Sequence, residues 1–221
     1  MQQKHLLSSV IDAAVLNANA TELDIVTACA EAKTYKYYGL DVHLAFASIA
    51  KRLLKGTKTK LIVVIGYPLG ATSTEAKMFE TLQAIKAGAD EIDMTMNIGS
   101  FKSHHYEEAK KDISAVVEAA QGRPVKVIIE TGFLNHEEII IASHLVVAGG
   151  AQFVKTSSGY GPRGASLTDI KIIRNAIGPD FGIKASGGIM TAKHALALIE
   201  AGATRIGTSH AKHVMETMPK E

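Results

Sequence analysis

The chain has 221 residues, enough for one domain with a large core. Its 24 lysines and arginines nearly balance its 22 aspartates and glutamates, so no excess charge favours nucleic acid or a membrane surface as a partner. Hydrophobic residues make up 47% of the chain but aromatic residues only 5%, which indicates an aliphatic core. The single cysteine, Cys29, excludes an intramolecular disulfide and is typical of a reducing compartment.

Targeting and membrane signals are missing from the sequence. Residues 1–5 lack the apolar core of a signal peptide, and no apolar run reaches transmembrane length. We therefore expect a soluble, cytoplasmic protein that binds neither membranes nor nucleic acid.

Eight short segments have the composition of buried strands. They span residues 10–16, 41–46, 61–67, 91–97, 125–131, 153–157, 182–186 and 204–209. Helical segments separate them, and residues 21–24, 72–75 and 135–138 have the pattern of a helix cap.

An internal repeat decides between architectures. Residues 87–93, 148–155 and 201–207 share one pattern, in which a helix ends at a glycine suited to the left-handed conformation and a strand follows. These glycines are Gly88, Gly149 and Gly202. Eight alternating strand–helix units without a linker predict one domain over residues 1–221, an α/β protein with a single closed parallel (β/α)8 TIM barrel. A doubly wound open sheet is the alternative, but it usually has fewer strands and a GxGxxG motif after the first, which is missing here.

Lysines stand at equivalent places in two successive predicted strands. Lys155 lies in an apolar strand that runs into a glycine-rich turn, and Lys184 repeats this arrangement. Burying an ammonium group is costly, and a lowered pKa relieves the cost by making the amine a nucleophile for carbonyl groups. Neighbouring strands lie about 4.8 Å apart, so the two amines should lie side by side and lower each other's pKa. We predict that Lys155 forms an imine; the alternative is a lysine that extends to solvent.

Two carboxylates also lie at predicted strand ends, where barrel enzymes place their chemistry. Asp93 could relay protons or simply pair with a buried lysine, and we favour the relay. Glu130 could be a second acid or base, but a structural partner to Lys126 or to a neighbouring strand is the favoured interpretation.

Glycine-rich turns lie at the ends of the last three predicted strands, at residues 158–164, 187–189 and 207–209. Barrels often bind phosphate with the loops after strands 7 and 8. The predicted substrate and phosphate contacts are Ser158, Gly159, Gly187, Gly188, Gly207 and Ser209. Arg163 could add a charged clamp or face solvent.

The histidine pairs do not have the pattern of a metal site. His104 and His105 are adjacent and diverge, and neither they nor His210 with His213 have a third ligand in reach. We expect surface histidines, no metal and no other cofactor.

Long motifs resemble the deoxyribose-phosphate aldolase family of class I (Schiff-base) aldolases over most of the chain. They occupy residues 64–71, 91–99, 126–131, 153–157, 184–189 and 200–207. The resemblance implies metal-independent, reversible cleavage of 2-deoxyribose 5-phosphate into acetaldehyde and glyceraldehyde 3-phosphate. It also implies that Lys155 carries the Schiff base, that Lys184 lowers the pKa of Lys155, and that Asp93 takes part in proton transfer. A homo-oligomer, dimer or tetramer, is a further implication.

Four departures from the family pattern leave two alternatives open. Ala13–Ala14 stand where a polar pair is common, residues 42–46 lack a proline-containing turn, His210 replaces a serine, and the tail 218–221 has no aromatic residue. One alternative is a related imine aldolase with a different or unphosphorylated aldehyde. The other, less favoured, is a barrel that binds a sugar phosphate without turning it over.

Overall fold

The computed structural model describes residues 7–218. Residues 1–5 and 219–221, on which the expectations about a signal peptide and most of the tail rest, lie outside the described residues. None of the helices described is both long enough and apolar enough to span a membrane.

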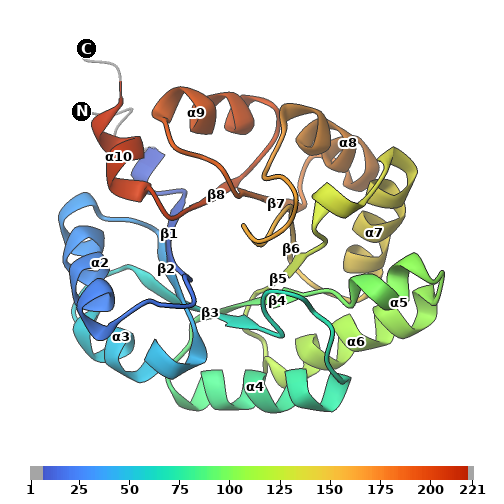
Figure 1. The fold of residues 1–221 in the computed structure, drawn as a ribbon, viewed down its shortest axis with the longest axis horizontal. Coiled ribbons are helices and arrows are strands. Elements are labelled where there is room, and N and C mark those ends of the chain that lie inside the picture. The colour runs from blue at the N-terminus through green and yellow to red at the C-terminus, as the bar shows by residue number, and fades with distance from the viewer. Residues whose placement is uncertain (1–6, 219–221) are drawn as a thin grey trace.

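Eight parallel strands follow one another in chain order around a closed barrel (Figure 1). They are β1 (Ile11–Val15), β2 (Gly39–Val42), β3 (Lys60–Ile65), β4 (Glu91–Thr95), β5 (Val125–Ile128), β6 (Phe153–Lys155), β7 (Gly182–Ser186) and β8 (Arg205–Thr208). The barrel closes because β8 also pairs with β1, where Ile11 lies opposite Ile206. The predicted (β/α)8 barrel is confirmed.

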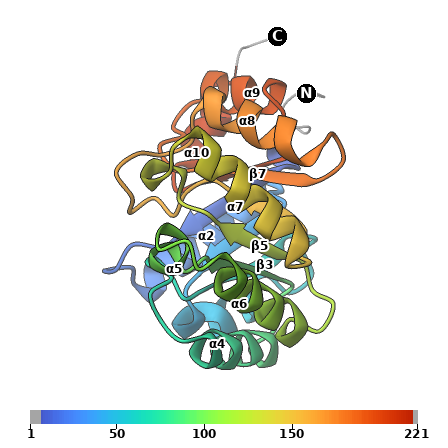
Figure 2. The same cartoon turned by 90° about the vertical axis from the view of Figure 1, so that its right-hand side faces the viewer.

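Helices form a ring around the strands (Figure 1). They are α2 (Glu22–Tyr35), α3 (Ala47–Leu53), α4 (Thr74–Lys86), α5 (Ile98–Lys102), α6 (Tyr106–Ala119), α7 (His136–Ala148), α8 (Leu167–Ile177), α9 (Ala192–Glu200) and α10 (Ala211–Glu216). Two short 3-10 helices, η1 (Leu44–Phe46) and η2 (Thr131–Phe133), follow β2 and β5. Figure 2 shows α6 and α7 next to each other on the outside of the barrel.

Side chains cap the helices where the sequence indicated. Thr21 and Asn135 each form a capping box with the residue three positions later, and Ser73 accepts a hydrogen bond from the amide of Ala76. These caps satisfy amides that have no partner inside the helix.

Strand β2 differs from its prediction. It begins at Gly39 rather than at residue 41 and ends at Val42, after which the chain turns into η1. Gly39 permits close packing at the start of the strand, because an added Cβ would lie 2.5 Å from Cδ1 of Ile62. The shift places Asp41 near the carboxyl end of its strand instead of at its start.

The second repeat also uses its glycines differently. Gly88 and Gly202 have positive φ, as predicted, but in the second repeat Gly150 takes this conformation. Gly149 has a φ of −76° and serves close packing, because an added Cβ would lie 2.5 Å from Cγ2 of Ile113. The prediction for Gly149 was therefore wrong by one residue.

Alternation along each strand sorts the side chains into two environments. Aliphatic residues such as Ile92, Val127 and Ile183 face the helices and are fully buried in the hydrophobic core. The alternate positions face the barrel interior, where charged side chains are concentrated. This is unusual, because aliphatic residues normally fill the interior of such barrels.

Candidate active site

Eight charged side chains contact one another in the barrel interior and form what we call the interior charge cluster. Its acidic members are Asp12, Asp41, Glu91 and Asp93, and its basic members are Lys126, Lys155, Lys184 and Arg205. All eight are buried. Four negative and four positive charges cancel when all are ionised, which makes their burial possible.

Lys155 and Lys184 lie at paired positions on β6 and β7, as the sequence predicted. Their amines lie on the same side of the sheet, because both contact one oxygen of Asp93. The Nζ atoms of Lys155 and Lys184 lie 2.7 and 2.8 Å from Oδ2 of Asp93. Lys184 also donates to Oδ2 of Asp41, at 2.8 Å, and contacts Oδ2 of Asp12, at 2.7 Å.

Asp93 is held in its charged form. Burial raises its pKa, but Lys126, Lys155 and Lys184 outweigh burial, so the pKa of Asp93 lies well below its usual value of 3.8. Lys126 donates to the Oδ1 atom at 2.8 Å, so both oxygens of Asp93 are engaged.

Lys184 is likewise held in its charged form. Burial lowers its pKa, but Asp12, Asp41 and Asp93 outweigh burial and place it well above the usual 10.5. The prediction that the two amines lower each other's pKa was therefore wrong for Lys184, because these three carboxylates outweigh the repulsion from Lys155.

A second layer of charge lies below the two lysines. The Lys126 amine contacts Glu91 at 2.6 Å, and the guanidinium of Arg205 contacts Asp12 at 3.1 Å and Glu91 at 3.4 Å. The Tyr38 hydroxyl also donates to Glu91, at 2.7 Å. The sequence analysis missed Asp12, Asp41, Glu91 and Arg205 as site residues. The available signal was a charge at alternate positions of otherwise apolar strands.

A cavity of about 340 Å³ opens above the cluster at the carboxyl ends of the strands. Six of its lining residues are the predicted substrate contacts Ser158, Gly159, Gly187, Gly188, Gly207 and Ser209. Lys155 also lines it, whereas Asp93 and Lys184 lie beneath and are fully buried. The structure therefore gathers all nine predicted site residues around one cavity, in two layers.

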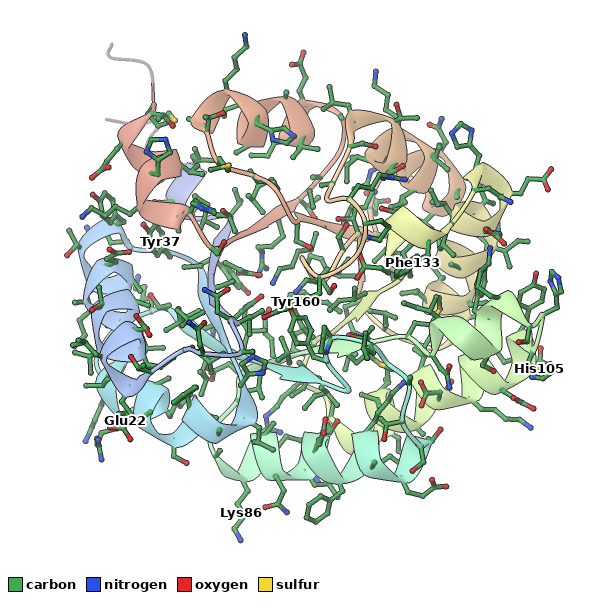
Figure 3. The ribbon with its side chains drawn as sticks, in the orientation of Figure 1. Glu22, Tyr37, Lys86, His105, Phe133 and Tyr160 are labelled. Atoms are coloured by element: carbon green, nitrogen blue, oxygen red, sulfur yellow. The ribbon has the colours of Figure 1, made fainter. Side chains whose placement is uncertain are left out.

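Tyrosines form one wall of this cavity. The hydroxyl of Tyr67 donates to the carbonyl of Ser158 at 2.6 Å, and that of Tyr160 donates to the carbonyl of Leu16 at 2.9 Å. The two rings meet edge to face with centroids 5.9 Å apart. Figure 3 shows Tyr160 near the middle of the barrel. Burial raises the pKa of Tyr67, so its hydroxyl stays protonated.

Other candidates lie around the cavity rather than in it. Glu130 accepts a hydrogen bond from the amide of Ser158 at 3.0 Å, so it holds the loop after β6. Arg163 pairs with Asp169 and donates to the carbonyl of Thr131 at 2.9 Å. It does not line the cavity.

The histidines of the two pairs, His104 with His105 and His210 with His213, are exposed, as predicted, although His210 also lines the cavity rim. Within residues 7–218, no cluster of three or more histidine, cysteine, aspartate or glutamate side chains could hold a metal ion.

A larger groove of about 860 Å³ lies at the opposite end of the barrel. It is lined mainly by lysines and threonines, including Lys55 and Lys58, and contains no member of the interior charge cluster. The smaller cavity is therefore the candidate active site.

Aldolases are among the known proteins that resemble this chain in sequence and in fold. The model of the DeoC/LacD family aldolases matches residues 7–213. The deoxyribose-phosphate aldolase of Aciduliprofundum boonei is 49% identical over 214 residues, which cover 96% of each chain. The one from Clostridium novyi is 47% identical over 216 residues and 97% of each chain. A tetrameric deoxyribose phosphate aldolase from Aeropyrum pernix superposes with a TM-score of 0.89 at 31% identity, covering 98% of this chain and 92% of that one. With its family match running through all eight strands and the lysine pair, this chain belongs to the DeoC/LacD family of aldolases.

Proposed function

We propose that this protein is a deoxyribose-phosphate aldolase, which reversibly cleaves 2-deoxy-D-ribose 5-phosphate into acetaldehyde and D-glyceraldehyde 3-phosphate through an imine on Lys155. One observation carries the assignment of the nucleophile. Of the lysines in the interior charge cluster, Lys155 alone lines the cavity, while Lys126 and Lys184 are fully buried beneath it. The relatives named above carry the same activity in their names.

The reaction follows from an amine in this position. Neutral Lys155 attacks the aldehyde carbon C1, and loss of water gives an iminium, which acts as an electron sink. The bond between C2 and C3 then breaks as a base takes the proton of the C3 hydroxyl. The enamine that remains is protonated at C2 and hydrolysed to acetaldehyde.

Two buried residues, Lys184 and Asp93, lie beside the amine of Lys155. Lys184 supplies a fixed positive charge beside the nucleophile, and its amine shares Oδ2 of Asp93 with the amine of Lys155. Asp93 contacts both amines, so we assign it to proton transfer at the nitrogen of Lys155. Because Asp93 does not line the cavity, this transfer runs through the lysine rather than directly to substrate carbon.

The glycine-rich rim is suited to the phosphate. Gly187 and Gly188 have φ values of +88° and +70°, and their lack of a side chain lets a ligand approach the backbone. Ser209 adds a hydroxyl on the neighbouring turn, where it contacts Nδ1 of His210 at 3.1 Å. We assign Ser158, Gly159 and Gly207 to the same substrate-binding rim, since they line the same cavity.

Borohydride reduction in the presence of 2-deoxyribose 5-phosphate tests the nucleophile. The expected result is one covalent adduct, located at Lys155 by peptide mapping. Lys155→Ala should abolish both the adduct and cleavage, because no other lysine within residues 7–218 lines the cavity. Lys171→Ala is the matched control, since Lys171 is exposed on α8. An adduct on a different lysine, or cleavage by the Lys155→Ala variant, would contradict the assignment.

A different acceptor aldehyde is the second candidate. Ala14 and Asp41 line the cavity and favour it, since they give this wall an unusual mixture of apolar and acidic character. A panel of phosphorylated and unphosphorylated aldehydes separates the two candidates. Cleavage that depends on Lys155 would also exclude a barrel that only binds sugar phosphates.

We also propose an oligomeric state, a cellular location and a domain organisation for the enzyme. We propose a homo-oligomer, dimer or tetramer, because the Aeropyrum pernix relative is described as tetrameric. A cytoplasmic location fits Cys29, which is a buried free thiol. The barrel formed by residues 7–218 supports one domain over residues 1–221.

A further inference from the structure

Asp41 is the one carboxylate that lines the cavity among the residues described. It lies on β2, opposite Ala14 of β1, and its side chain is only 1% exposed. Its Oδ2 atom accepts hydrogen bonds from the amines of Lys184, at 2.8 Å, and Lys155, at 3.4 Å. Asp41 therefore reaches both the nucleophile and the space in which a substrate would be bound.

The other oxygen of Asp41 has no partner. Its Oδ1 atom is buried and makes no hydrogen bond. The buried aspartates beside it are fully engaged: Asp12 binds Arg205 and Lys184 with separate oxygens, and Asp93 binds lysines with both of its oxygens. A buried polar atom without a partner is costly, and a substrate hydroxyl bound in the cavity would supply the partner that Oδ1 of Asp41 needs.

Asp41 also differs from its neighbours in its affinity for a proton. Burial and the nearby carboxylates raise its pKa above the usual 3.8, even though Lys184 and Lys155 act in the opposite direction. The pKa of Asp93 is instead well below that value, and that of Asp12 is lowered, because lysines and Arg205 outweigh burial there. Asp41 is therefore the aspartate in this cluster that takes up a proton most readily.

We propose that Asp41 is the acid–base residue that faces the substrate, taking the proton from the C3 hydroxyl and returning it to the enamine carbon C2. This role rests on the proposed function, because it requires an imine on Lys155. The imine carbon C1 is bonded to Nζ of Lys155, so C2 and C3 lie one and two bonds further on. The distance of 3.4 Å from Nζ to Asp41 brings these atoms within reach of its carboxylate.

The proton and electrons balance through one residue. The C3 hydroxyl proton moves to Oδ1 of Asp41, and the O–H electron pair forms the C3 carbonyl of glyceraldehyde 3-phosphate. The electron pair of the C2–C3 bond moves to C1–C2 and neutralises the iminium nitrogen. Asp41 then protonates C2 and restores the iminium, which water hydrolyses to acetaldehyde and the free amine. Asp41 begins and ends as a carboxylate, and water is the only other reactant.

The test separates imine formation from proton transfer at carbon. Borohydride trapping with acetaldehyde reports the imine on Lys155, and incorporation of deuterium into the methyl group of acetaldehyde in D2O reports proton transfer at C2. Asp41→Asn keeps the shape of the side chain but removes the acid. We expect trapping to persist while deuterium exchange and cleavage fall about 10²- to 10⁴-fold, with KM little changed.

Two further variants make the result decisive. Asp41→Glu keeps the acid and the charge balance, so it should fold and show an exchange rate between those of the wild type and Asp41→Asn. Asp90→Asn is the control; it changes a carboxylate before β4 that pairs with Lys51 at the other end of the barrel, and it should leave the exchange rate unchanged. Melting temperatures check the fold of each variant.

The outcomes distinguish acid–base catalysis by Asp41 from a role in which it only supports the lysines. Equal losses of trapping and exchange in Asp41→Asn would mean that Asp41 only supports the lysines, and an unchanged exchange rate would also overturn the proposal. If Asp41→Asn does not fold, a wild-type exchange rate in Asp41→Glu would overturn it, because a displaced acid should slow the reaction. Failure of the wild-type enzyme to trap any aldehyde would overturn the proposed function itself.

Discussion

Lys184 holds the interior charge cluster together, because its amine contacts Asp12, Asp41 and Asp93 at 2.7 to 2.8 Å. Lys184→Met removes this charge and leaves the three carboxylates with one partner fewer inside the barrel. We expect a loss of about 3–5 kcal/mol in the free energy of unfolding, since a broken buried ion pair leaves uncompensated charge. Cleavage should also be lost. Urea unfolding and a cleavage assay measure the two effects.

A matched variant shows whether burial is the cause. Lys171→Met removes an exposed lysine and should change the free energy of unfolding by no more than about 0.5 kcal/mol. Equal stability of the Lys184→Met protein and the wild type would contradict the ionised cluster described here.

The positions of single site residues were predictable where successive strands share a sequence pattern. Lys155 and Lys184 occupy equivalent places in successive strands, so their proximity follows from the pairing of parallel strands alone. The carboxylates that surround them do not follow in this way. Asp41 is 143 residues away from Lys184 in the chain, and the closure of the barrel brings them together.

At the scale of elements, a small error in one strand concealed a residue of the site. With β2 expected at residues 41–46, Asp41 stands at the start of the strand, far from the mouth of the barrel. The observed strand, Gly39–Val42, puts Asp41 in its third position and on the interior face. Strand ends are the least certain part of a sequence-based prediction, and here the strand begins two residues earlier than expected.

The loops after β6 and β7 are packed backbone to backbone. The amide of Ala165 donates to the carbonyls of Ser186 and Gly187, and an added Cβ on Gly164 would lie 2.1 Å from the carbonyl oxygen of Gly187. Gly164→Ala must therefore displace the turn that carries Gly187 and Gly188. We expect KM for the sugar phosphate to rise more than kcat falls, as measured by steady-state kinetics, because this turn belongs to the proposed phosphate rim.

A glycine elsewhere provides the comparison for this substitution. Gly99 lies in α5, and an added Cβ there would meet only Oδ1 of Asn97, at 3.6 Å. Gly99→Ala should leave KM unchanged. If Gly164→Ala also leaves KM unchanged, the loop after β7 does not bind the phosphate.

At the scale of the whole molecule, the barrel depends on buried charges where such folds normally have an aliphatic interior. The clearest consequence is a dependence of stability on pH at both extremes. Asp93 and Asp12 have pKa values below 3.8 in the folded state, so their contribution is present above that pH and is lost as the pH falls further. Asp41, with a raised pKa, acts in the opposite direction and reduces this loss.

Lys184 and Lys126 contribute to the alkaline limit, as do buried acidic groups with a raised pKa such as the Cys29 thiol. The pKa values of the two lysines lie above 10.5 in the folded state, so their contribution is complete below pH 10.5 and disappears as the pH rises through the folded values. We expect the free energy of unfolding, measured with urea, to be nearly constant from about pH 5 to about pH 9 and to fall on either side.

Measuring the pH dependence of the free energy of unfolding at low and high salt identifies the charges responsible for it. Raising the salt concentration from about 0.1 M to about 1 M shortens the Debye length from about 10 Å to about 3 Å and screens exposed pairs such as Lys110 and Glu107. The interior charge cluster is buried, so its share of the profile should persist. Lys184→Met should reduce the alkaline dependence. A profile that flattens in high salt would instead assign the dependence to the surface, and the buried cluster would then not be ionised as its contacts indicate.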